Sequence, residues 1–108
     1  MSIMALSAQS ALKILARALE ERFGEDVQPY VFGSYARGEE AEGSDLDVLL
    51  IVPPELRRAV RQRAAEVVSS LQIAGAPPVS FMLIGPDGWQ QLTPFVREAK
   101  RDAVALKF

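Results

Sequence analysis

Neither cysteine nor histidine occurs among the 108 residues of the chain. The absence of cysteine excludes disulfides, thiolate metal sites and cysteine nucleophiles. The absence of histidine removes the commonest general base and every imidazole metal ligand. Any chemistry must therefore use carboxylates, hydroxyls, lysine, arginine and a metal ion taken from solution. This restriction favours magnesium-dependent phosphoryl chemistry over hydrolysis by a catalytic triad or by zinc.

The sequence also lacks a strong excess of either charge and a long apolar run. Its net charge of −2 and pI near 5.1 argue against direct nucleic-acid binding, which usually needs a basic surface. No segment approaches the roughly 18–20 apolar residues of a membrane span, and Lys13 and Arg17 interrupt the apolar N-terminal segment. We therefore expect a cytoplasmic protein without a membrane anchor, folded as a single domain over residues 1–108.

Helical periodicity of apolar residues appears twice. The first series runs from Leu12 to Phe23 and predicts a helix that Ser7 caps and Gly24 ends. Its apolar face is interpreted as core, with a partner-binding helix as the alternative. The second series runs from Leu56 to Leu71 and predicts a helix that begins at Pro54. Its first half carries arginines that are interpreted either as solvated charge or as a patch for an acidic partner or a nucleic acid: Arg57, Arg58, Arg61 and Arg63.

Apolar runs of strand length predict a small sheet. The expected strands are residues 30–32, 46–52 and 79–84, with a short terminal strand within 103–108. The first is expected to be buried, and the second is apolar enough to be a central strand covered on both faces. Together with the helices, these strands predict an α+β fold, an α/β sandwich in which a small mixed sheet of three to four strands is flanked by about four helices.

Two shorter helices are predicted in the C-terminal third. One covers residues 86–92, and the other starts with Thr93 as N-cap and Pro94 in its first turn. The last helix is expected to bury Phe95, Val96 and Ala99. A contact of the exposed apolar surface around Trp89, Phe95 and Phe108 with a second copy or a partner is the alternative.

The candidate catalytic and ligand-binding residues lie between Tyr30 and Val52. A glycine-serine pair, Gly33-Ser34, ends the first strand and permits close approach of a ligand to the backbone. Asp45 and Asp47 open the second strand, and residues i and i+2 of a strand project from the same face. Two carboxylates on one side of a strand that face a glycine-bounded loop suit a hard divalent cation that carries a phosphate.

The loop between these strands contains further candidates. Residues 34–38 are predicted to form a helical turn whose free N–H groups favour an anion. Arg37 can reach either a phosphate or the acids Glu39, Glu40 and Glu42. Ser44 is expected to cap or orient the carboxylate of Asp45.

The joint pattern resembles a known family. Its residues are Gly33, Ser34, Ala36, Arg37, Gly38, Ser44, Asp45 and Asp47. In this order and spacing, between two strand-like runs, they resemble the nucleotidyltransferase superfamily of the DNA polymerase beta type. The full string GSYARGEEAEGSDLDVLLIV is similar to its small stand-alone branch, the minimal nucleotidyltransferases, which often serve as antitoxins beside a HEPN-domain toxin.

The resemblance implies a site and a reaction. Gly33 and Ser34 would hold the triphosphate of ATP, with Arg37 and Ser44 as further nucleotide-binding residues. Asp45 and Asp47 would be the catalytic residues and would bind two Mg²⁺ ions. An enzyme of this kind would transfer AMP to a tyrosine hydroxyl of a HEPN toxin partner. The resemblance also implies the nucleotidyltransferase fold.

One position departs from the family pattern. Active members carry a third acidic residue on the next strand, where this sequence has Ser80. Serine neither accepts a proton at neutral pH nor holds a metal with a charge, and Asp87 is expected to lie too far along the chain to replace the acid. The alternative function is therefore a weakened or inactive subunit that binds and blocks its partner. A small-molecule modifier ranks last, because such enzymes usually need a second domain to seat the acceptor.

Overall fold

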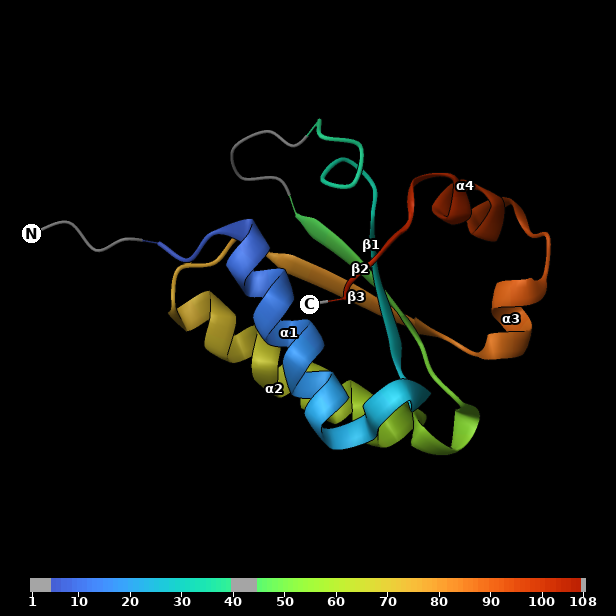
Figure 1. The fold of residues 1–108 in the computed structure, drawn as a ribbon, viewed down its shortest axis with the longest axis horizontal. Helices are drawn as coiled ribbons and strands as arrows, with labels where there is room; N and C mark the ends of the chain where they lie inside the picture. The colour runs from blue at the N-terminus through green and yellow to red at the C-terminus, as the bar shows by residue number, and fades with distance from the viewer. Residues whose placement is uncertain (1–4, 40–44, 108) are drawn as a thin grey trace, which may run out of the picture.

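The sheet of the protein separates two pairs of helices. In the computed structural model, which describes residues 5–39 and 45–107, α1 (Ala8–Phe23) and α2 (Arg57–Ile73) lie on one side of it. The shorter helices α3 (Pro86–Gln90) and α4 (Pro94–Asp102) lie on the other side (Figure 1). The predicted α+β class, with a small mixed sheet between helices, is confirmed.

The sheet contains four strands in the spatial order β3-β2-β1-β4. These are β1 (Gln28–Phe32), β2 (Leu46–Ile51), β3 (Val79–Ile84) and β4 (Val104–Ala105). Strand β1 pairs antiparallel with both β2 and β4, whereas β2 and β3 are parallel. The nearly continuous apolar sequence of β2 matches its central place, because its residues from Val48 to Leu50 are completely buried.

Helices α1 and α2 close one face of the sheet. Ser7 caps α1 by accepting a hydrogen bond from the backbone N–H of Ser10 at 3.1 Å, and Gly24 ends it with φ +61°. Leu12, Leu15 and Leu19 are buried against the sheet, so the apolar face of α1 is core, as predicted. The interpretation of this face as a partner-binding surface is therefore not needed.

Helix α2 begins later than predicted. Residues Pro54–Leu56 form a 3₁₀ turn, and the α-helix starts at Arg57 rather than at Pro54. The N–H of Leu56 donates to the carbonyl of Pro53 at 3.0 Å, which is the i→i−3 bond of a 3₁₀ turn. The fixed φ of Pro54 suits the first turn of either kind of helix, and 3₁₀ turns are frequent at the N-terminal ends of α-helices.

The opposite face, under α3 and α4, is covered over β1 and β2 and is open along β3, where Ser80 and Met82 are exposed. Thr93 caps α4 as predicted, since its hydroxyl accepts from the N–H of Val96 at 3.3 Å. Val96 and Ala99 are buried, but Phe95 is 41% exposed, so the expectation that Phe95 is buried was wrong. Val96 and Ala99 are three residues apart and share the inner side of the helix, whereas Phe95 is offset from it by one residue, about 100°.

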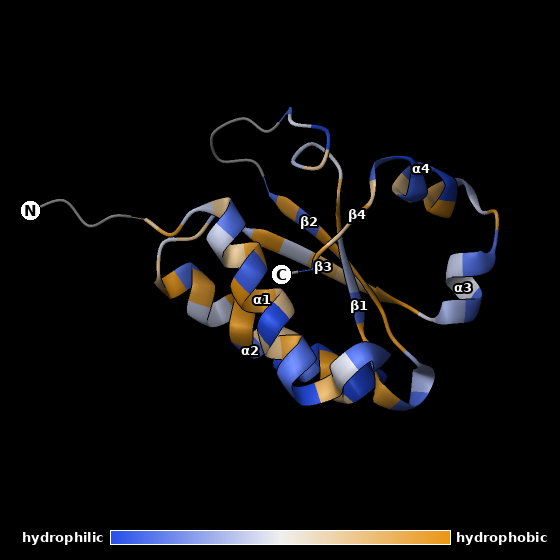
Figure 2. Ribbon diagram, viewed as in Figure 1, coloured by the Kyte–Doolittle hydropathy of each residue, from blue (hydrophilic) through white to orange (hydrophobic). Residues whose placement is uncertain are grey.

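The expected burial of β1 also needs correction. Only Val31 in this strand is buried, because it faces α1 and α2. Tyr30 and Phe32 point to the other face and are half-buried, beside Trp89 at 5.7 Å and Phe95 at 6.1 Å between ring centroids. In Figure 2, α3 shows none of the orange of apolar residues that runs along β2. The cover on this face therefore consists of these aromatic contacts and the buried side of α4, and it does not extend to Ser80 and Met82 on β3.

No helix among the described residues is long and apolar enough to cross a membrane.

Candidate functional site

Gly33 lies directly against Asp47 at the end of β1. Phe32 pairs with Asp47 across the β1–β2 ladder, and Gly33 follows with φ +77°. A Cβ atom at this position would lie 2.6 Å from Oδ2 of Asp47. Both the left-handed backbone and the missing side chain are therefore required here. The group that approaches the glycine in this structure is the Asp47 carboxylate, and the predicted approach of a ligand stays a prediction.

Asp45 and Asp47 stand at the entrance of β2. Asp45 is exposed and Asp47 is half-buried, while Leu46 and Val48 between and after them face the core. Burial, and to a lesser degree the negative charge of Asp45, raise the pKa of Asp47 above its usual value. The two carboxylates are thus close enough to repel each other, and a divalent cation between them would relieve that repulsion.

Ser80 is the nearest polar side chain on the neighbouring strand. It pairs with Asp47 in the parallel β2–β3 register, and its hydroxyl donates to Oδ2 of Asp45 at 3.3 Å. Asp87 lies in α3, beyond the far end of β3. Among residues 5–39 and 45–107 no third carboxylate joins Asp45 and Asp47 in a metal-binding group. The interpretation of Ser80 as the residue beside the two acids agrees with this geometry.

The predicted turn after Gly33 is present. The N–H of Arg37 donates to the carbonyl of Gly33 at 3.2 Å, and the N–H of Glu39 donates to the carbonyl of Ser34 at 2.9 Å. Ser34 is half-buried at the start of this turn, and Gly38 closes it with φ +72°. Ser34 directly follows Gly33, which lies against Asp47. The pairing of β1 with β2 therefore brings together the motif residues on both sides of the loop.

Arg37 binds carboxylates in this structure. Its Nε donates to Glu39 at 2.9 Å and one terminal nitrogen donates to Asp102 at 2.8 Å, and both bonds raise the pKa of Arg37. Of the two alternatives from the sequence, pairing with acids is therefore the one observed. Glu40, Glu42 and Ser44 lie outside the described residues.

Asp102 is a contributor that sequence reasoning missed. It comes from the end of α4, 65 residues from Arg37. One signal pointed to it, because an aspartate at the C-terminal end of a helix is unfavourable with the helix dipole and calls for a cation nearby. Lys100 and Arg101 in the same last turn made that signal easy to overlook.

The donor set fits magnesium. Asp45 and Asp47 offer carboxylate oxygens and Ser80 offers a hydroxyl, all of them hard oxygen ligands, in a site open on one side. Mg²⁺ usually takes one or two protein carboxylates and completes its shell with water and phosphate oxygens. Two carboxylates beside the 34–38 turn can therefore hold a metal together with a polyphosphate.

Comparison with known proteins decides the family. The family model described as a nucleotidyltransferase domain matches residues 12–103. The chain belongs to this nucleotidyltransferase family. Gly33, the 34–38 turn, Asp45 and Asp47 all lie inside the matched range, and so does Ser80. No curated protein matches the sequence.

A solved structure supports the fold of this nucleotidyltransferase domain. It is a crystal structure of a toxin-antitoxin with AMP-PNP, with a TM-score of 0.58 and 18% sequence identity. The match covers 89% of this chain and 72% of the other. At this identity the likeness establishes a shared architecture.

Proposed function

We propose that this nucleotidyltransferase domain is an antitoxin that transfers AMP from ATP to a tyrosine hydroxyl of a partner HEPN toxin. The observation that carries the proposal is the contact of Gly33 with Asp47, which joins a turn suited to phosphate with a carboxylate pair suited to Mg²⁺. The sequence contains no histidine or cysteine, and its motifs offer no other set of candidate catalytic residues.

The reaction replaces one phosphorus–oxygen bond with another. The acceptor oxygen bonds to the α-phosphorus, the bond to the β-phosphate bridge breaks, pyrophosphate leaves, and the hydroxyl proton passes to solvent. Gly33, Ser34 and the turn N–H groups bind phosphate oxygens and orient the chain of phosphates. Asp45 and Asp47 hold Mg²⁺, two ions by resemblance to the family. When bound, the metal neutralises charge that develops on the phosphates.

The proposed partner follows from two likenesses. The motif from Gly33 to Asp47 resembles minimal nucleotidyltransferases that act as antitoxins, and the fold matches a structure of a toxin-antitoxin with AMP-PNP. Both point to a protein acceptor and an adenine nucleotide. Such an ATP-dependent pair would act in the cytoplasm, and the net charge of −2 argues against general binding of the chain to RNA.

A second candidate function rests on Ser80. This residue occupies the register position beside Asp47, and a serine hydroxyl cannot take up the acceptor proton or add a charge to a metal site. A domain in which catalysis is lost could still bind its partner and block it. Nucleotide binding without turnover distinguishes this candidate from the first.

The test is incubation with α-labelled ATP and Mg²⁺, with and without the protein encoded by the adjacent gene. We expect label on a tyrosine of that neighbour, and we expect Asp45→Asn together with Asp47→Asn to abolish it. Asp26→Asn together with Asp87→Asn is the matched control, since both acids lie at the opposite end of the sheet. Tight binding of the neighbouring protein without labelling would refute the proposed AMP transfer and would support the second candidate, a subunit that only binds and blocks its partner.

A further inference from the structure

A cavity of about 440 Å³ adjoins the carboxylate pair on its β1 side. Its walls come from the end of β1, the turn and α4, and include Phe32, Gly33, Arg37, Phe95, Glu98 and Asp102. The volume is within the range of pockets that hold small organic ligands. The proposed function accounts for Gly33 in this set but gives no role to the α4 residues.

The position of the cavity ties it to the phosphate site. Gly33 belongs to both, and Phe32 pairs with Asp47 on the same face of the sheet. Side chains paired across a ladder are about 5 Å apart at Cβ. A ligand that places a phosphate over Asp47 can therefore extend directly into the cavity without crossing a strand.

The apolar wall of the cavity presents an aromatic ring that the core does not use. Phe95 meets Phe32 edge-on, with 88° between ring planes, and remains 41% exposed. The contact with Phe32 restricts the orientation of the Phe95 ring, and the exposed part of that ring stays accessible to a ligand. An accessible aromatic ring is a stacking platform for a planar base.

The polar wall presents two carboxylates, Glu98 and Asp102, beside the guanidinium groups of Arg37 and Arg101. Asp102 accepts from Arg37 through Oδ2, and Glu98 lies one helical turn earlier on α4. A carboxylate has about four acceptor positions, so Asp102 can accept a further hydrogen bond while it holds Arg37. Acidic side chains of this kind bind the hydroxyl groups of ribose in other nucleotide sites.

We propose that this cavity binds the nucleoside part of the nucleoside triphosphate, with the base on Phe95 and the ribose at Glu98 and Asp102. The inference rests on the proposed function, because it places the phosphates at Gly33 and the carboxylates. The acceptor then approaches over Ser80 and Met82. Both are exposed on β3, and Met82 is 45% exposed, so this flank of Asp47 is open to a protein-sized partner.

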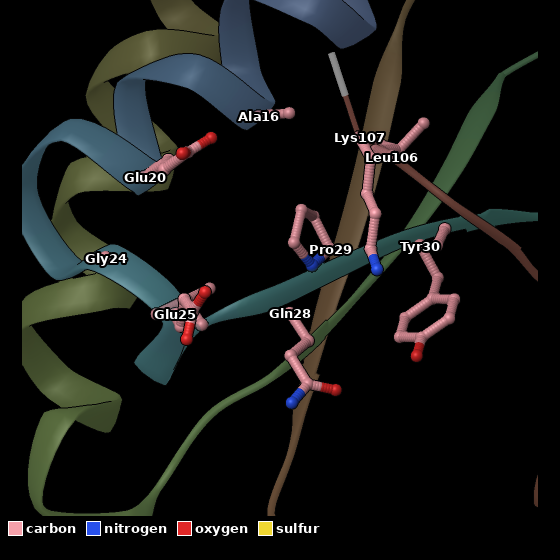
Figure 3. Close-up of a pocket in the computed structure, with 11 residues that line it drawn as sticks. Ala16, Glu20, Gly24, Glu25, Gln28, Pro29, Tyr30, Leu106 and Lys107 are labelled. Atoms are coloured by element: carbon pink, nitrogen blue, oxygen red, sulfur yellow. The ribbon is translucent and has the colours of Figure 1, made fainter.

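A second cavity, of about 450 Å³, does not compete for this role. Figure 3 shows its walls, with Glu20 and Glu25 on one side and Tyr30 and Lys107 on the other. It lies at the Gln28 end of β1, and Gln28 pairs with Ile51 at the far end of β2 from Asp47. A nucleoside bound there could not share a triphosphate with the carboxylates.

The test compares the binding of ATP and of inorganic tripolyphosphate by calorimetry, in Mg²⁺ and without an acceptor. In the wild type, ATP should bind more tightly than tripolyphosphate. Phe95→Ala should weaken ATP binding about tenfold, the usual scale for one base–aromatic stack, and leave tripolyphosphate unchanged. Ile14→Ala is the matched control, because it removes a similarly exposed apolar side chain from α1, on the other side of the sheet, and it should change neither affinity. Met82→Ala probes the β3 flank of Asp47 in the same assay.

Three results would overturn the inference. The first is unchanged ATP affinity in Phe95→Ala, and the second is a loss confined to Met82→Ala, which would move the nucleoside to the β3 flank. The third is an equal loss for both ligands in Phe95→Ala, since a base contact cannot affect tripolyphosphate. A wild type that binds neither ligand would instead refute the proposed function itself.

A measurement on the wild type covers the case in which Phe95→Ala does not fold. With phenylalanine rings isotopically labelled, nuclear Overhauser effects should connect the adenine protons of bound ATP to a phenylalanine ring. Binding of ATP without such a contact would also overturn the inference.

Discussion

The face of the sheet under α1 and α2 is closed by apolar side chains along its whole length, whereas the face under α3 and α4 is open along β3. Leu15, Val48 and Leu50 on the first face are completely buried. On the second face Asp47 is half-buried and Ser80 and Met82 are exposed. The comparison teaches that one face supplies most of the stability, which leaves the other free to hold charged groups that weaken the fold.

The largest effect is expected from the carboxylates on the open face. Asp47→Asn should reduce AMP transfer by about a hundredfold or more, because it removes a charged metal ligand. The same change should raise the melting temperature in metal-free buffer. The raised pKa of Asp47 means that its ionised form is less favourable in the folded protein than in the unfolded chain, so at neutral pH the charge opposes folding.

Rate measurements and thermal melts with and without Mg²⁺ check this prediction. Mg²⁺ should raise the melting temperature of the wild type and have little effect on Asp47→Asn. Asp87→Asn, on the exposed first turn of α3, should behave as the wild type in both respects. A lower melting temperature of Asp47→Asn in metal-free buffer would contradict the conclusion that the Asp47 charge destabilises the folded protein.

On the closed face, the largest effect is expected on stability. Leu15→Ala should lower the free energy of unfolding by about 2–5 kcal/mol, because Leu15 is completely buried and its removal leaves a cavity. Met82→Ala on the open face should cost well under that amount. Urea denaturation followed by circular dichroism measures both. Similar losses for the two variants would break the contrast between the faces.

Substitution of Gly33 tests the contact between the end of β1 and the Asp47 carboxylate. Gly33→Ala should destabilise the fold by about 1–3 kcal/mol and should weaken the Mg²⁺-dependent rise in melting temperature. The added methyl group would displace the Asp47 carboxylate, 2.6 Å away, and would also meet the strain of φ +77°. Urea denaturation and melts in Mg²⁺ give the two quantities.

Gly38→Ala is the matched control for Gly33. Its φ of +72° carries similar backbone strain, but a Cβ atom there would meet nothing within 4 Å. It should lose stability and keep the response to Mg²⁺. If both variants lost that response equally, the contact with Asp47 would have no special role.

The smallest effect is expected at the pair that joins the turn to α4. Asp102→Asn should raise the affinity for tripolyphosphate about two- to fivefold, because it removes a negative charge from the site and frees Arg37 from one of its two carboxylates. Stability should change little, because the Arg37 side of the pair is exposed and Glu39 still binds the guanidinium. Calorimetry at two salt concentrations checks the effect, which should shrink at the higher one. Unchanged affinity at low salt would show that Asp102 does not restrain Arg37.

The sequence by itself determined the local elements and the pair of acids. Ser7, Gly24 and Thr93 mark helix ends through hydrogen bonds and backbone angles that span only a few residues, and all three were predicted. The same holds for Asp45 and Asp47, because alternation along a strand places residues i and i+2 on one side. The family resemblance indicated Ser80 as the residue beside the two acids on the next strand, and the strand register pairs it with Asp47.

The tertiary structure decided the contacts between distant parts of the chain. The bond from Arg37 to Asp102 spans 65 residues, and no local pattern specifies which of several acids an arginine will meet. The exposure of Phe95 depends on how α4 is rotated over β1, which Val96 and Ala99 set by their burial. The cavity beside Asp47 arises from that same placement. Periodicity and caps act over one or two turns, whereas the walls of a site come from packing, which only the folded chain brings together.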